Sequence, residues 1–171
     1  IGLWVIHFVD AGLMKGGLKQ RFGIRPRTRF NPLAILISPF LHVDRRHLAA
    51  NSIPFFVLGS LVLIQGQAVF WTTTVIIILI AGLGIWLFGK SGTLHVGASG
   101  LILGYFGSIL SSLFFSPDLA TIILAVVVTV LYLGLIKQVV PLKQGVSTMG
   151  HLFGFLGGVA AAWVVALIQL G

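Results

Sequence analysis

Charged residues and cysteine are scarce in this sequence of 171 residues. Only 8% of the residues are charged, compared with about 25% in a soluble domain, and 57% are hydrophobic. This composition excludes an ordinary soluble domain and predicts an integral membrane protein. Cysteine is absent, which excludes disulfide bonds, a thiolate nucleophile and metal sites with cysteine ligands.

Acidic residues are also few. The sequence has three of them, Asp10, Asp44 and Asp118, against 11 lysines and arginines, and its net charge is +8. In a membrane protein, basic loops set the topology or contact lipid phosphates, so this excess does not indicate nucleic-acid binding. We expect the lipid bilayer as a partner and no nucleic acid.

Six apolar segments account for most of the chain. A bilayer core of about 30 Å takes roughly 20 apolar residues per helix, so the chain has room for about six spans and no separate soluble domain. We predict an all-α polytopic membrane protein with one domain over residues 1–171. The expected spans are residues 1–13, 45–64, 68–88, 98–115, 119–136 and 147–171. The first is short, so either the chain begins inside this helix or the helix has lost its start.

Two connecting regions stand out. Residues 15–46 hold eight of the basic residues and three prolines, which predicts a large first loop. Its apolar middle, residues 33–41, is expected to lie in the membrane interface. Asp44 is a natural N-cap for the second span. Residues 137–145 are expected to form a loop before the last span.

The polar side chains of the spans gather at one end of their helices. His47 and Asn51 lie in the first two turns of the second span, Ser99 starts the fourth, and His151 lies near the start of the sixth. Alternate spans enter the bilayer from the same side, so we expect these side chains at one depth on one face. A serine and a histidine provide a nucleophile and its general base. The Asn51 amide and His47 provide hydrogen-bond donors for an oxyanion.

Glycines offer a way to bring Ser99 and His151 together. Gly154 and Gly158 follow His151 on the same stripe of the helix, and small residues let helix backbones approach closely. The fourth span offers a matching small surface of Gly100, Gly104 and Gly107, and Gly97 just before it is expected to serve in helix packing near the site. Close packing of these two helices would bring the Ser99 hydroxyl within reach of the His151 imidazole.

The aspartates do not complete a catalytic triad. Asp118 falls on the opposite side of the membrane, and Asp44 is better explained as a helix cap. We therefore predict a Ser99–His151 dyad. No metal site is expected, because His42 and His47 are five residues apart and lack the carboxylate partner found in metalloprotease helices.

Three motifs resemble those of the rhomboid family of intramembrane serine proteases, and the chain resembles a divergent prokaryotic member. The motifs are Gly97-Ala98-Ser99-Gly100, His151-x-x-Gly154-x-x-x-Gly158, and His47-x-x-x-Asn51 preceded by His42. Their order and placement imply a six-transmembrane-helix rhomboid-like bundle.

The resemblance also implies residue roles. Ser99 would be the nucleophile, and His151 would be its general base and acid. His47, Asn51 and the Ser99 amide would form the oxyanion site, with His42 in support. The family cleaves single-span membrane proteins near the top of their helices and needs no cofactor.

Two features give conflicting orientations. All 11 lysines and arginines lie on the loops of the face where the site opens, and the positive-inside rule would place this face in the cytoplasm. Bacterial relatives open their site to the outside. We follow the resemblance and expect a multi-pass protein of the cell membrane whose site opens to the extracytoplasmic side.

Two other functions remain open. A catalytically silent rhomboid-like protein would bind or escort membrane clients, although such proteins usually lack the serine or the histidine. A small transporter or channel would use His47, Asn51 and His151 to line a path. That function gives Ser99 no role, and no membrane-embedded carboxylate accompanies His47, Asn51 and His151 in the predicted group.

Overall fold

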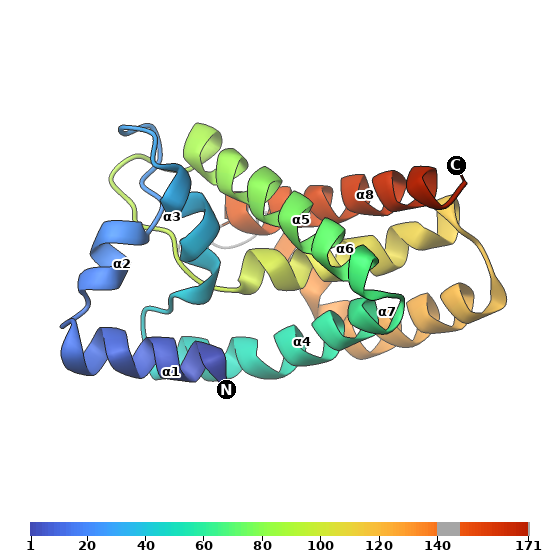
Figure 1. The fold of residues 1–171 in the computed structure, drawn as a ribbon, viewed down its shortest axis with the longest axis horizontal. Helices are drawn as coiled ribbons and strands as arrows, with labels where there is room; N and C mark the ends of the chain where they lie inside the picture. Colours follow the sequence, from blue (N-terminus) through green and yellow to red (C-terminus); the bar gives the residue numbers. More distant parts are fainter. Residues whose placement is uncertain (140–147, 171) are drawn as a thin grey trace.

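The computed structural model describes residues 1–139 and 148–170 of the chain. In these residues the regular elements are helices (Figure 1). In chain order they are α1 (Gly2–Phe8), η1 (Val9–Leu13), α2 (Gly17–Phe22), α3 (Pro32–Ile37), η2 (Ser38–Phe40), α4 (Arg45–Ile64), α5 (Gln67–Phe88), α6 (Ser99–Phe115), α7 (Leu119–Val139) and α8 (Thr148–Leu170). The predicted all-α fold is confirmed.

The long helices begin and end where the sequence has local signals. The Asp44 side chain accepts the His47 backbone N–H at 2.8 Å and so caps the start of α4. Gly66 separates α4 from α5. Asp118 accepts the Thr121 backbone N–H at 2.7 Å before the first turn of α7. Helix α7 continues to residue 139, and residues 140–145 of the expected loop lie outside the described residues.

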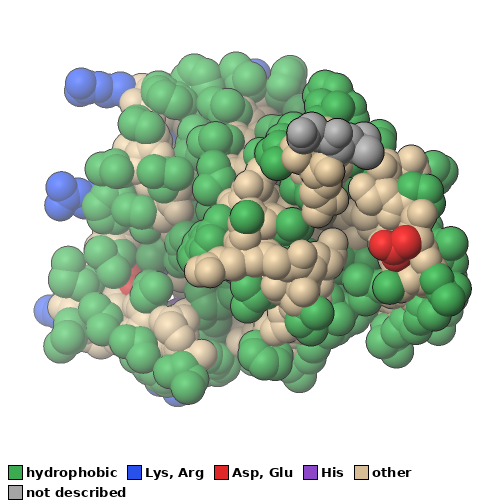
Figure 2. All heavy atoms as spheres, turned by 45° about the vertical axis from the view of Figure 1, so that its right-hand side comes forward, with side chains coloured by type: hydrophobic (Ala, Val, Ile, Leu, Met, Phe, Trp, Pro, Cys, Tyr) green, Lys and Arg blue, Asp and Glu red, His purple; other side chains and the backbone are tan. Residues whose placement is uncertain are grey.

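Length and composition identify the membrane-crossing helices. Among the described residues, α4, α5 and α8 are each long and apolar enough to cross a membrane. Three shorter apolar helices, Gly2–Leu13, Ser99–Phe115 and Leu119–Leu135, correspond to the other expected spans. Large apolar side chains cover much of the outer surface (Figure 2). Such a surface is unfavourable in water and suits a lipid environment, so the fold is that of an integral membrane protein.

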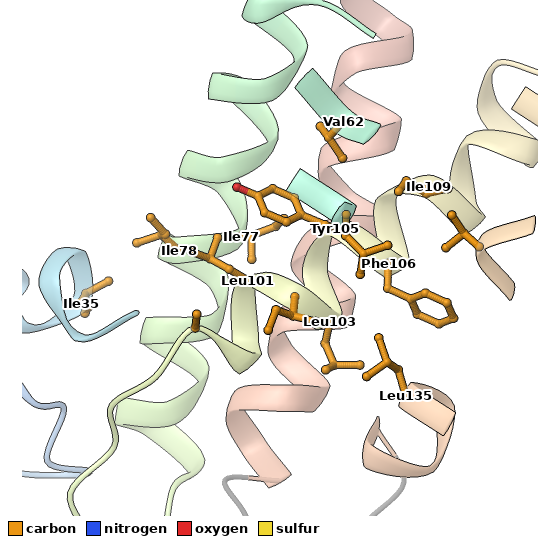
Figure 3. Close-up of a cluster of buried hydrophobic side chains, with 14 of the residues drawn as sticks. Ile35, Val62, Ile77, Ile78, Leu101, Leu103, Tyr105, Phe106, Ile109 and Leu135 are labelled. Atoms are coloured by element: carbon orange, nitrogen blue, oxygen red, sulfur yellow. The ribbon is translucent and has the colours of Figure 1, made fainter. Parts of the chain in front are cut away.

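Helix α6 is the central element of the bundle. It contacts α4, α5, α7 and α8 (Figure 1), and most of its side chains are buried. The buried cluster around it joins residues from several helices: Val62, Ile77, Leu103, Tyr105, Phe106 and Leu135 (Figure 3). This packing fixes Ser99, the first residue of α6, relative to the helices around it.

The first polar region contains more helix than expected. Asn31 caps α3 by accepting the Ala34 N–H at 3.3 Å, and Pro32 takes the first helical position. Helix α3 packs against α5, where a β-carbon on Gly82 would overlap the Ile35 side chain. Residues 33–41 therefore bury part of their apolar surface against protein, while Leu33 stays exposed.

Candidate active site

Helices α6 and α8 meet backbone to backbone. A β-carbon on Gly154 would overlap the carbonyl oxygen of Gly100, and one on Gly158 would overlap the carbonyl oxygen of Gly104. These two pairs are one helical turn apart on each helix, so the contact runs along both glycine stripes. The close approach expected from the sequence is present in the structure.

This contact brings the turns that carry Ser99 and His151 together. A β-carbon on Gly100 would lie 3.2 Å from the Gly150 carbonyl oxygen, so the chain neighbours of the two residues face each other. Ser99 is half-buried at the start of α6, and His151 is 3% exposed in the first turn of α8. Both residues line one cavity of about 1140 Å³.

His47 and Asn51 line the same cavity from α4. Both side chains pack against the turn before Ser99. A β-carbon added to Gly97 in this turn would lie 2.7 Å from His47 Cε1 and 3.7 Å from Asn51 Nδ2. Gly97 has a φ of +123°, a conformation that side chains disfavour. We expected Gly97 to serve in helix packing near the site, and the structure places it in the turn before α6, where it packs closely against the His47 and Asn51 side chains of α4.

His42 lies buried beneath these donors. Its Nε2 accepts a hydrogen bond from Asn51 Nδ2 at 3.2 Å and one from the Ala98 backbone N–H at 3.5 Å. A nitrogen that accepts a backbone N–H carries no proton, so the proton of the neutral ring is on Nδ1. Burial, and then the charges of His47 and His7, lowers the pKa of His42 to about 4. His42 is therefore neutral near pH 7 and remains an acceptor for Asn51.

The Asn51 amide has a second hydrogen besides the one that it donates to His42. An amide nitrogen carries two hydrogens, and the bond to His42 uses one of them. The same bond fixes which end of the amide faces His42. Asn51 can therefore offer its second N–H to an oxygen bound in the cavity.

Sequence reasoning missed His95, which lies four residues before Ser99. It lines the large cavity and also a smaller one. Its Nε2 lies 2.7 Å from Thr93 Oγ1, and its backbone exchanges hydrogen bonds of 2.9 and 3.0 Å with Ile24. Burial lowers the pKa of His95. This residue fastens the loop before Ser99 to the first polar region, and its only sequence signal was its proximity to the serine.

The smaller cavity has a volume of about 30 Å³ and also touches Ser99. Small and aliphatic residues form most of its wall, including Ile35, Ala81 and Gly82. One water molecule needs about 10–15 Å³, so this space suits a water molecule or a small apolar group. It is open to the same serine that faces the large cavity.

Two basic residues are among those that line the large cavity. Arg27 and Lys90 line the large cavity, together with Asp44. The lysines and arginines whose side chains are described lie in residues 15–46 and at residue 90, and Figure 2 shows such side chains gathered along one edge. Within residues 1–139 and 148–170, no three His or Asp side chains are placed to hold a metal ion.

Asp118 lies far from the serine. The 17 residues of α6 separate Ser99 from the turn that holds Asp118, and at 1.5 Å per residue this helix is about 25 Å long. Asp118 therefore lies at the other end of α6, as expected from the alternation of the spans. It caps α7 there.

Comparison with known proteins gives consistent matches. The family model described as Rhomboid domain matches residues 29–168. Uncharacterised proteins of Mycobacterium bovis and Mycobacterium tuberculosis are each 35% identical over 172 residues, which covers 96% of this chain and 71% of theirs. An uncharacterised protein of Mycobacterium leprae is 35% identical over 140 residues, covering 77% of this chain and 55% of that protein.

Proposed function

This chain belongs to the rhomboid family, and from that premise we propose that it is an intramembrane serine endopeptidase. One observation carries the proposal. Ser99, His151, His47 and Asn51 come from three helices and line a single cavity at one end of the bundle. A nucleophile, a base and two hydrogen-bond donors around one space are the groups that acyl transfer requires.

Ser99 and His151 would carry the covalent chemistry. A substrate helix unwinds into the cavity, and the Ser99 oxygen attacks the scissile carbonyl while His151 takes the hydroxyl proton. His151 then gives this proton to the leaving amine, which departs and leaves an acyl-enzyme. Water attacks the ester, His151 takes a proton from the water and returns it to Ser99, and the second product leaves as a carboxylic acid.

Donors on two helices would stabilise the tetrahedral oxyanion. Asn51 offers its second amide hydrogen and His47 offers a ring N–H from the same wall of the cavity. The backbone N–H of Ser99 belongs to the first turn of α6, where helix amides lack intrahelical partners and the helix dipole favours negative charge. Such prearranged donors supply much of the rate enhancement in acyl transfer.

The cavities fit a peptide as substrate. The smaller cavity beside Ser99 would hold a small side chain next to the scissile bond. Ala50 and Pro54 line the large cavity, and proline at position 54 leaves the carbonyl of residue 50 without its helical donor. This carbonyl would accept an N–H from an unwound substrate or from water. We infer that the substrates are single-span membrane proteins.

A cleavage assay tests the proposed function. The purified protein in liposomes is incubated with several single-span substrates, with a fluorophosphonate or with a chelator. We expect at least one substrate to be cut near the top of its helix, with cleavage blocked by the fluorophosphonate and unaffected by the chelator. If no substrate is cut and the fluorophosphonate labels nothing, the silent, client-binding function is favoured instead.

We also propose that the site opens to the extracytoplasmic side of the cell membrane. The chain has no cysteine, so a single introduced cysteine reports its own location. In intact cells, a membrane-impermeant maleimide is expected to label Lys90→Cys beside the cavity. Asp118→Cys, at the other end of α6, is the matched control and should be labelled only after the cells are permeabilised. The reverse pattern would show that the site faces the cytoplasm.

A further inference from the structure

The N-terminal segment, residues 1–22, lies before the residues that match the family model. It contacts helix α4, which carries the proposed oxyanion donors His47 and Asn51. This segment contains α1, η1 and α2, the last of which ends at residue 22, and the family match begins at residue 29. Trp4 Nε1 donates to Ser52 Oγ at 3.1 Å, and the Arg45 guanidinium lies 5.3 Å from the centre of the Phe8 ring. Both contacts join α1 to α4 (Figure 1). The chain thus adds its own support to the helix that carries His47 and Asn51.

A buried carboxylate organises this N-terminal segment. Asp10 lies in the π-helical turn η1 and is 1% exposed. Its Oδ1 accepts the Leu18 N–H at 2.9 Å, and its Oδ2 lies 3.6 Å from Lys19 Nζ. A buried charge is costly unless it is paired and hydrogen-bonded. Asp10 therefore fixes both the start of α2 and the position of the Lys19 ammonium.

Lys19 links the N-terminal segment to the residues just before α4. Its Nζ donates to the Val43 carbonyl at 3.2 Å, and its side chain is only 19% exposed. Val43 stands between His42, which holds the Asn51 amide, and Asp44, which caps α4. A hydrogen bond from a charged donor is stronger than a neutral one, so this bond restrains the chain where it enters α4.

We propose that the Asp10–Lys19 pair is a positioning device for the oxyanion donors. By holding the Val43 carbonyl, it sets His42 and the first turns of α4, and thereby the placement of Asn51 and His47 relative to Ser99. Neither residue touches the reacting atoms. This inference rests on the proposed function, in which those donors stabilise the oxyanion. A misplacement of about 1 Å in such a site can cost about 100-fold in rate.

Substitution of Lys19 tests the proposal. Lys19→Met keeps the length of the side chain and removes the ammonium, so we expect kcat to fall by about tenfold to 100-fold while KM changes little. Lys19→Arg restores a charged donor and should recover most of the rate. The matched control is Arg21→Met, which removes a charge from the same helix, where the Arg21 guanidinium lies 5.2 Å from the centre of the adjacent Phe22 ring. This control should leave kcat unchanged.

A double-mutant cycle separates positioning from general destabilisation. If Lys19 acts through the donors, Lys19→Met should lower kcat far less in an Asn51→Ala background than in the parent. Losses that multiply in the double variant would overturn the proposal. An equal loss in Arg21→Met, or a change confined to KM, would overturn it too.

Hydrogen exchange tests the same device without any catalysis. Backbone amides of residues 43–48 should exchange faster in Lys19→Met than in the parent, and Arg21→Met should match the parent. Unchanged exchange in Lys19→Met would refute the positioning role even in an active protease. A different outcome is faster exchange in Lys19→Met although the parent protein cuts no substrate and is not labelled by the fluorophosphonate. This outcome would refute the proposed function but support the restraint on α4.

Discussion

Ser99→Ala is expected to abolish cleavage of every single-span substrate. Alanine has no hydroxyl to attack the carbonyl, so kcat should fall by about 10⁴-fold or more, leaving only the contribution of binding and of the oxyanion donors. Single-turnover cleavage in liposomes measures this loss. His151→Ala should lose a similar factor, and the double variant should be no slower than either single variant, because the two side chains act as a unit.

Ser112→Ala is the matched control for this prediction. Ser112 lies on the same helix, near its other end, and its hydroxyl donates to the Ile109 carbonyl at 2.7 Å. Removal of this hydroxyl should leave kcat unchanged. Cleavage that persists in Ser99→Ala, with the same product ends as the parent, would exclude Ser99 as the nucleophile.

Among glycine-to-alanine substitutions at the α6–α8 contact, Gly158→Ala should cause the largest loss of stability. A β-carbon there overlaps the Gly104 carbonyl oxygen and lies 2.7 Å from the Ser108 backbone nitrogen. Both neighbours are backbone atoms and cannot move aside as a flexible side chain would, so the helices must separate. We expect the free energy of unfolding to fall by about 3 kcal/mol, measured by denaturation in detergent micelles.

Gly134→Ala is the matched control for the helix contact. It makes the same change inside α7, where no described heavy atom beyond the chain neighbours and the nearby backbone of this helix lies within 4 Å of the added carbon. Its effect on the unfolding free energy should stay within about 1 kcal/mol, the difference in helix propensity between glycine and alanine. If Gly158→Ala unfolds like Gly134→Ala, the backbone contact between α6 and α8 is wrong.

The long helices were predictable because each membrane span requires a long apolar run of roughly 20 residues. Apolar runs of sufficient length end at clear breaks such as Gly66 and Pro117, and Asp44 marks the first turn of α4. The short helices of the first polar region were not predictable in the same way. Helix α3 gains its stability from packing Ile35 against Gly82 of α5, a partner that only the tertiary fold identifies.

The candidate site was predictable where residues sit on long helices. Ser99, His151, His47 and Asn51 follow from their positions near helix starts, and the glycine pairs follow from helical periodicity. The turn at Gly97 was not predictable in this way, because the sequence alone does not specify its φ of +123°.

The residues that support the site depend on how irregular segments fold. His42 accepts bonds from Asn51 and from Ala98, which is 56 residues away along the chain. Lys19 reaches Val43, which lies 24 residues further along. Periodicity cannot pair positions so far apart across loops, so these partners required the structure.

One measurement decides whether Ser99 is an activated nucleophile. The parent protein and His151→Ala are treated with a fluorophosphonate in liposomes, and mass spectrometry locates the modified residue. We expect the probe on Ser99 in the parent and almost no modification in His151→Ala. Equal labelling of Ser99 in both proteins, or labelling of another serine in the parent, would contradict the Ser99–His151 dyad.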